Sequence, residues 1–140
     1  MGVMTSLSST PHPAASEIRR WTLDSFPELR SLRASLREAL RETGSAEVDD
    51  LCDRVTVVAT ELATNALRHG LPPTVVSLLR EDDHLILDVA DHARESRPEV
   101  DADRPLGAGG LGLQLAKTFA IEVGWYRTDH TKHVWASFPS

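Results

Sequence analysis

The sequence predicts an α+β fold, a two-layer sandwich in which helices cover one face of a largely antiparallel sheet. Two observations support this class. In some segments leucine, valine and alanine recur every three or four residues, which is the period of an amphipathic helix. In others, apolar and polar residues alternate, which is the period of a strand. The expected order is strand, helix, helix, two strands, long loop, helix and two strands.

Size, composition and charge limit the class of protein. The chain has 140 residues, of which 41% are hydrophobic, enough for one domain with one core. Residues 1–16 are rich in Ser, Thr, Pro and Ala and show no periodicity. We therefore expect a disordered N-terminal tail, followed by a single domain over residues 17–140. The formal net charge of −6 argues against direct binding of nucleic acid or of a membrane surface.

Cysteine content and hydropathy favour a cytoplasmic protein. The single cysteine, Cys52, falls on the apolar face of a predicted helix, which indicates a small buried residue rather than a catalytic thiol. One cysteine allows no disulfide within the chain, which suits a reducing compartment. No apolar run approaches the roughly 18–20 residues of a membrane span. The N-terminus also lacks the basic and apolar regions of a secretory signal.

The domain is expected to begin with a strand and a helix. Residues 17–24 alternate in polarity and read as an edge strand, whose Trp21 suggests a possible homodimer contact. Ser25 and Pro27 then open a helix that Gly44 closes. The apolar stripe of this helix is Leu29, Leu32, Leu36 and Leu40.

A longer helix over residues 46–69 carries the most informative side chains. Glu61 and Asn65 are four residues apart, which places them about 40° apart around the helix axis and one turn apart along it. Both flank the apolar stripe, where an unpaired buried polar group costs about 1–3 kcal/mol. A surface glutamate and a satisfied buried amide are the alternative readings. His69 and Gly70 end the helix, and two prolines follow.

A hairpin follows, with strands over residues 74–80 and 84–91 around the acidic turn 81–83. Alternation in the second strand predicts that Asp91 ends the row that faces the core. The alternative is that Asp91 has passed the strand end and caps the next turn.

A long polar loop over residues 92–106 then leads to a glycine-rich turn. Its glycines are Gly107, Gly109, Gly110 and Gly112, and they run directly into a helix over residues 111–120. Such a turn suits a phosphate group, because a helix N-terminus exposes N–H groups and the positive end of its dipole, but it equally suits a hinge. Strands over residues 121–127 and 131–139 complete the chain.

Three separated motifs together resemble the GHKL (Bergerat-fold) ATP-binding superfamily, which includes gyrase B, MutL and histidine kinases. The segment Glu61-Leu-x-x-Asn65-Ala-x-x-His69-Gly70 is similar to its N box. Asp91 stands where its first glycine box begins, and residues 107–115 resemble its second glycine box. Within the superfamily, the short chain looks like the anti-sigma-factor serine kinases and the small ATP-binding regulators of actinobacteria.

The resemblance implies a role for each matching residue. Asn65 would give an oxygen to Mg²⁺, the metal that bridges the phosphates of ATP. Glu61 would act as general base towards the attacking hydroxyl. Asp91 would accept the adenine amino group. The lid that cradles the phosphates would contain Leu111 and the four glycines of the turn.

The sequence departs from the family pattern in two places. The first glycine box is normally Asp-x-Gly-x-Gly, whereas residues 91–95 contain no glycine. In the last strand a threonine normally supports the adenine; His133 aligns best with it, and Thr131 lies two residues earlier. Which of the two would serve stays open. His69 would either pack on Asn65 or cap its helix, or take part in the chemistry.

The implied function is that of an ATP- and Mg²⁺-dependent serine/threonine kinase that regulates transcription. It would transfer the γ-phosphoryl group to an anti-sigma-factor antagonist of the STAS type and would sequester a sigma factor. The alternative is a partner-binding module of the same fold with weak or no catalysis. A histidine-kinase fragment is disfavoured, because the helix that follows Pro27 contains no histidine as phosphoacceptor.

Overall fold

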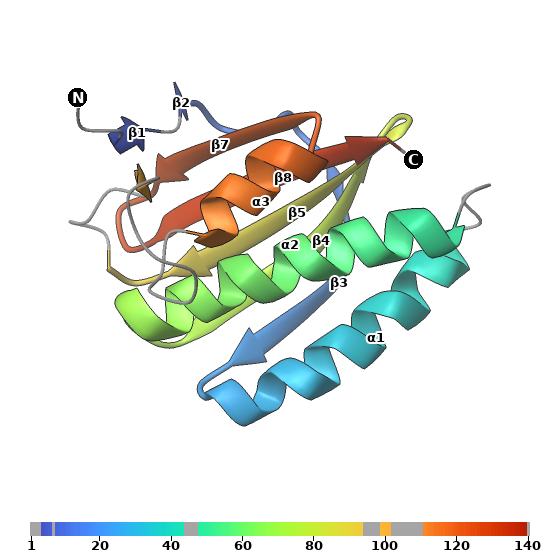
Figure 1. The fold of residues 1–140 in the computed structure, drawn as a ribbon, viewed down its shortest axis with the longest axis horizontal. Helices are drawn as coiled ribbons and strands as arrows, with labels where there is room; N and C mark the ends of the chain where they lie inside the picture. The colour runs from blue at the N-terminus through green and yellow to red at the C-terminus, as the bar shows by residue number, and fades with distance from the viewer. Residues whose placement is uncertain (1–3, 7, 44–47, 94–98, 102–110, 140) are drawn as a thin grey trace.

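The computed structural model describes residues 4–6, 8–43, 48–93, 99–101 and 111–139 (Figure 1). The main sheet has the strand order β2-β7-β8-β5-β4-β3. Its strands are β2 (Ser8–Ser9), β3 (Ser16–Leu23), β4 (Thr74–Glu81), β5 (His84–Asp91), β7 (Glu122–Arg127) and β8 (Lys132–Pro139). All neighbours are antiparallel except the short β2, which pairs parallel to β7. The predicted antiparallel sheet is confirmed, with β3 at its edge.

The helices lie together on one face of this sheet, as Figure 1 shows. They are α1 (Leu29–Glu42), α2 (Val48–His69) and α3 (Leu111–Phe119), and the short 3-10 helix η1 (Phe26–Glu28) precedes α1. The α+β class with helices on one face is therefore confirmed. None of the helices within the described ranges is both long and apolar enough to cross a membrane.

The core lies between the helices and the sheet. The leucine stripe of α1 is buried there as expected, and Cys52 of α2 is only 1% exposed. Strand β5 is buried on both faces rather than on one. Leu85, Leu87 and Val89 face the helices, whereas Ile86 joins Leu79 and Trp135 in a smaller cluster on the opposite face.

That opposite face is covered in part by the N-terminal segment, which differs from the expected disordered tail. Ser8 and Ser9 of β2 pair with Gly124 and Trp125 of β7. The indole N–H of Trp135 donates to the carbonyl of Thr10 at 2.7 Å. Composition alone missed this docking, because the contacts that anchor the segment come from residues more than a hundred positions away.

Further differences concern the long loop and the edge strand. Within the loop, β6 (Glu99–Asp101) pairs antiparallel with β1 (Met4–Ser6). On β3, Trp21 is half-buried against the core, and its indole N–H donates to the hydroxyl of Ser35 on α1 at 2.9 Å. The Trp21 side chain is therefore packed and hydrogen-bonded within its own domain, and it is not the exposed dimer contact that the sequence suggested.

Candidate functional site

The C-terminal end of α2 meets the end of β5 at a tightly packed contact. The amide of Gly70 donates to the carbonyl of Ala66 at 2.8 Å, which adds one more helical bond beyond His69. A Cβ atom on Gly70 would lie 2.5 Å from the Cγ atom of Asp91 and 2.6 Å from the carbonyl oxygen of Ala66. Only glycine allows the helix and the carboxylate to approach this closely. The glycine after the N-box-like segment is thus required by Asp91.

Asp91 both faces the core and caps the next turn, which the sequence left open as alternatives. It faces the helices and is only 4% exposed, and it also closes the following turn, because its Oδ1 atom accepts the amide N–H of Ala93 at 2.6 Å. Its Oδ2 atom lies 3.6 Å from the Nζ atom of Lys132. Lys132 is itself 8% exposed. The end of the sheet therefore presents a buried carboxylate beside a buried ammonium.

Glu61 and Asn65 lie on the same helix, before this contact. Both are half-buried, and the side chain of neither is hydrogen-bonded to another residue that the structure describes. Asn65 directly precedes Ala66, whose carbonyl oxygen borders the Asp91 contact. The structure therefore brings Asn65 and Asp91 to the same end of the domain, with Glu61 one helical turn further back.

The glycine-rich turn is only partly within the described residues. Gly107, Gly109 and Gly110 lie outside them. Leu111 and Gly112 form the first turn of α3, which packs against α2. The helix that was expected after the glycine-rich turn is therefore confirmed. The phosphate-binding role of the turn stays a prediction.

His133 is not part of this site. The register pairs Lys132 with Asp91 and His133 with Ala90, so His133 lies on the face of the sheet opposite to the helices. Its Nε2 atom is 2.8 Å from the hydroxyl of Thr131, which is on that same face. The expectation that His133 or Thr131 lies beside Asp91 to support the adenine is therefore corrected: the residue beside Asp91 is Lys132.

On that opposite face, His133 belongs to a polar cluster around Asp88. Asp88 is 4% exposed, and its carboxylate lies 2.7 Å from Nδ1 of His133, 3.2 Å from Nε2 of His12 and 3.0 Å from the hydroxyl of Tyr126. Burial raises the pKa of Asp88, but the hydrogen bonds from His12 and His133 outweigh it and hold the pKa below its ordinary value. Burial and the Asp88 charge raise the pKa of Tyr126.

The same cluster ties down the N-terminal segment. The hydrogen bond with Asp88 raises the pKa of His12, against the opposing effect of burial. The imidazole also packs edge-on against the rings of Tyr126 and Trp135. Sequence reasoning missed this cluster, although an aspartate in the middle of an apolar strand was a signal that it needs buried partners.

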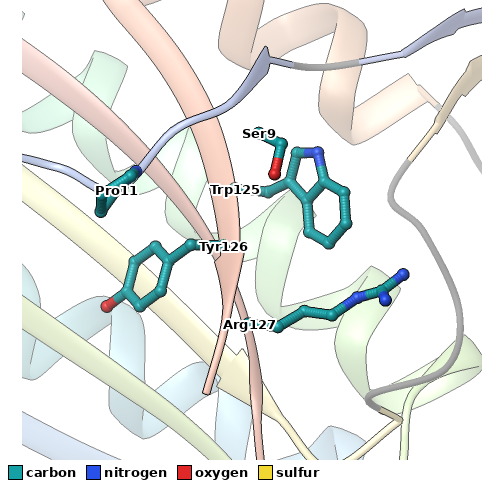
Figure 2. Close-up of a pocket in the computed structure, with 5 residues that line it drawn as sticks. All are labelled: Ser9, Pro11, Trp125, Tyr126 and Arg127. Carbon is teal, nitrogen blue, oxygen red and sulfur yellow. The ribbon is translucent and has the colours of Figure 1, made fainter.

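A surface hollow of about 580 Å³ lies along β7, next to the docked N-terminal segment. Its lining residues are Ser9, Pro11, Trp125, Tyr126 and Arg127. Figure 2 shows Tyr126 on one side of the strand and both Trp125 and Arg127 on the other. The lining side chains thus lie on both sides of β7, and Asp91 is not among them.

Comparisons with known proteins agree with this architecture. The family model described as "Histidine kinase-like ATPase domain" matches residues 25–138. No curated protein matches this sequence. Among solved structures, the chain is similar to the RsbU and RsbW domains of Rv1364c from Mycobacterium tuberculosis, with a TM-score of 0.60 and 18% identity over 86% of this chain. The match covers 32% of that solved chain, and at this identity it shows the fold alone.

Proposed function

The chain belongs to the family of histidine kinase-like ATPase domains, and from that premise we propose that it is an ATP-binding regulator of the anti-sigma-factor kinase type. In this proposal it transfers the γ-phosphoryl group of ATP to a serine or threonine of an anti-sigma-factor antagonist. It also sequesters a sigma factor. The observation that carries the proposal is the contact of buried Asp91 with the end of the helix that bears Glu61 and Asn65.

The residues at this contact fit a nucleotide. Asp91 is a buried carboxylate that accepts hydrogen bonds only, which suits the exocyclic amino group of adenine. Asn65 has an amide that no described residue engages, and an amide oxygen is a ligand that Mg²⁺ accepts beside water and phosphate oxygens. When bound, Mg²⁺ would neutralise charge on the phosphates of ATP. Asn65 would hold it from the protein side.

Glu61 supplies the group that a phosphoryl transfer requires from the protein. As a carboxylate one turn before Asn65, it would accept the proton of the attacking serine or threonine hydroxyl. Most of the rate increase in such reactions comes from positioning the two substrates and stabilising charge, and a general base contributes about 10²–10⁴-fold. If Glu61 is the general base, removal of its carboxylate should therefore lower turnover without weakening ATP binding.

A second candidate function is a partner-binding module with little or no nucleotide chemistry. Its specific support is that both oxygens of Asp91 already have partners, namely the Ala93 amide and Lys132. The two candidates differ in a thermal unfolding experiment. Mg-ATP at about 100 times its Kd would stabilise a nucleotide-binding protein by about 2.7 kcal/mol. No shift at millimolar Mg-ATP would favour the binding module.

The test of the kinase is calorimetry with Mg-ATP followed by a transfer assay. Asp91→Asn should weaken ATP binding, whereas the matched change Asp129→Asn in the exposed turn between β7 and β8 should not. Soluble proteins of the native cell are then incubated with the purified chain and γ-labelled ATP. Label on serine or threonine of a captured protein supports the kinase. Tight ATP binding without any labelled partner would count against the transfer step.

A further inference from the structure

Asp91 is flanked on both neighbouring strands by polar side chains that the proposed function does not yet use. Lys132 of β8 is its register partner. On the other side, β4 pairs Val75 with Ala90, so that Thr74 is the next residue alongside Asp91. Thr74, Asp91 and Lys132 therefore form a row across three strands, on the face that the helices cover.

Both flanking side chains are buried and polar. Thr74 is fully buried, and its hydroxyl has no hydrogen-bond partner among the residues that the structure describes. An unpaired buried hydroxyl is rare in proteins, and it points to a water or a ligand that completes it. Lys132 is 8% exposed, and its Nζ atom lies 3.6 Å from Oδ2 of Asp91. That distance is an ion pair but is longer than a direct hydrogen bond.

We infer that Thr74 and Lys132, together with Asp91, form the base-reading set of the nucleotide site, and that the site accepts guanine as well as adenine. This inference rests on the proposed function. The carboxylate of Asp91 only accepts hydrogen bonds and the ammonium of Lys132 only donates them. A base that satisfies both must present a donor beside an acceptor along one edge.

Both common purines meet that requirement. Adenine offers its amino group to Asp91 and a ring nitrogen to Lys132. Guanine offers its N1–H and amino groups to the carboxylate, and its O6 atom to the ammonium. With N1–H and the amino group of guanine on the carboxylate, the ammonium supplies the donor that the neighbouring O6 atom requires. Thr74 donates or accepts as the base requires, because a hydroxyl does both.

The test is a calorimetric comparison of Mg-ATP and Mg-GTP on the full-length chain. We expect wild-type affinities for the two nucleotides to agree within about tenfold. Lys132→Thr should weaken GTP binding at least tenfold more than ATP binding, because the carbonyl O6 atom of guanine is a stronger acceptor than the ring nitrogen of adenine and loses more when the ammonium is removed. Lys132→Arg keeps a cation and should retain GTP binding. Lys117→Thr, at the other lysine of the chain, is exposed on α3 and serves as the matched control.

Thr74→Val should lower nucleotide affinity without lowering stability, a combination that a purely structural role of Thr74 would not produce. The substitution removes a hydroxyl that has no described partner, so the melting temperature should stay the same or rise. Nucleotide affinity should nevertheless fall by about threefold or more, as for the loss of one neutral hydrogen bond. Thr22→Val, on an exposed position of β3, is the control for the same chemical change.

Each outcome has a distinct meaning. Binding of neither nucleotide by the wild type overturns the proposed function and this inference with it. Binding of ATP without measurable GTP binding overturns the inference and leaves the function in place. Equal losses for both nucleotides in Lys132→Thr show a structural ion pair only, which also overturns it. Unchanged affinity in Thr74→Val removes Thr74 from the base-reading set.

Wild-type protein and base analogues keep the inference testable if Lys132→Thr does not fold. Inosine triphosphate has the O6 acceptor and the N1–H donor, so it should bind within about tenfold of ATP. The triphosphate of unsubstituted purine riboside lacks the exocyclic donor and should bind more weakly than both. The reverse ranking would overturn the inference without any variant.

Discussion

Gly70→Ala tests the link between packing and nucleotide binding most directly. The added Cβ atom would lie 2.5 Å from the Cγ atom of Asp91 and 2.6 Å from the Ala66 carbonyl oxygen. The Ala66 oxygen belongs to the backbone, and the Asp91 carboxylate is held by the Ala93 amide and Lys132, so the helix end and the carboxylate must separate. Overpacking of this kind costs about 1–3 kcal/mol. At roughly 3–5 °C per kcal/mol for a domain of this size, the melting temperature should fall by about 3–15 °C.

The effect on binding should exceed what this loss of stability explains. Separation moves the Asp91 carboxylate away from the place where it receives the base, so Mg-ATP affinity should fall at least tenfold even well below the melting temperature. Gly124→Ala is the matched control. Its Cβ atom would lie 2.7 Å from the Trp135 ring, away from Asp91, so stability should fall while ATP affinity stays that of the wild type. Wild-type ATP affinity in folded Gly70→Ala would refute the reasoning.

The remaining predictions concern the metal ligand, the general base and the histidine cluster. Asn65→Ala should abolish Mg²⁺-dependent ATP binding, because the metal loses the protein oxygen proposed here; unchanged affinity by calorimetry would exclude that role. Glu61→Ala should bind ATP as the wild type does but lower phosphoryl transfer by about 10²-fold or more, whereas Glu38→Ala on exposed α1 should do neither; retained turnover with a protein acceptor would argue against a general base. His12→Ala should destabilise the protein more at pH 5.5 than at pH 8, measured by thermal unfolding. The pKa of His12 is raised above 6.5, so its contribution is complete below that value and is lost as the pH rises through the folded-state pKa. The pKa of Asp88 is lowered, so its contribution to folding stability is present above pH 3.8 and is lost as the pH falls through the folded-state pKa. An equal destabilisation by His12→Ala at pH 5.5 and at pH 8 would contradict this account of His12.

Local patterns were sufficient to predict the main helices and strands and the class of fold, but not the short strands β1, β2 and β6. The period of Leu29, Leu32, Leu36 and Leu40 indicates a helix wherever the rest of the chain lies, and these leucines are buried in α1 as predicted. Alternation also located β5 and placed Asp91 at the end of its inward row. The spacing of Glu61 and Asn65 makes them neighbours on one helix, because the geometry of a helix is local.

The neighbours of each candidate residue depend on strand register and on distant contacts, so only the tertiary structure could identify them. A shift of one residue along β8 exchanges the two faces of the sheet, and the pairing of β5 with β8 puts Lys132, rather than His133, beside Asp91. The need for glycine at position 70 arises only because Asp91 packs against it from another element. The N-terminal segment lies on the sheet because Trp135 and Asp88 provide its hydrogen-bond partners, and no local pattern in residues 1–16 encodes those distant groups. Sequence alone thus determined the main helices and strands and which side chains are candidates for the chemistry, whereas the contacts of those side chains were decided by long-range packing.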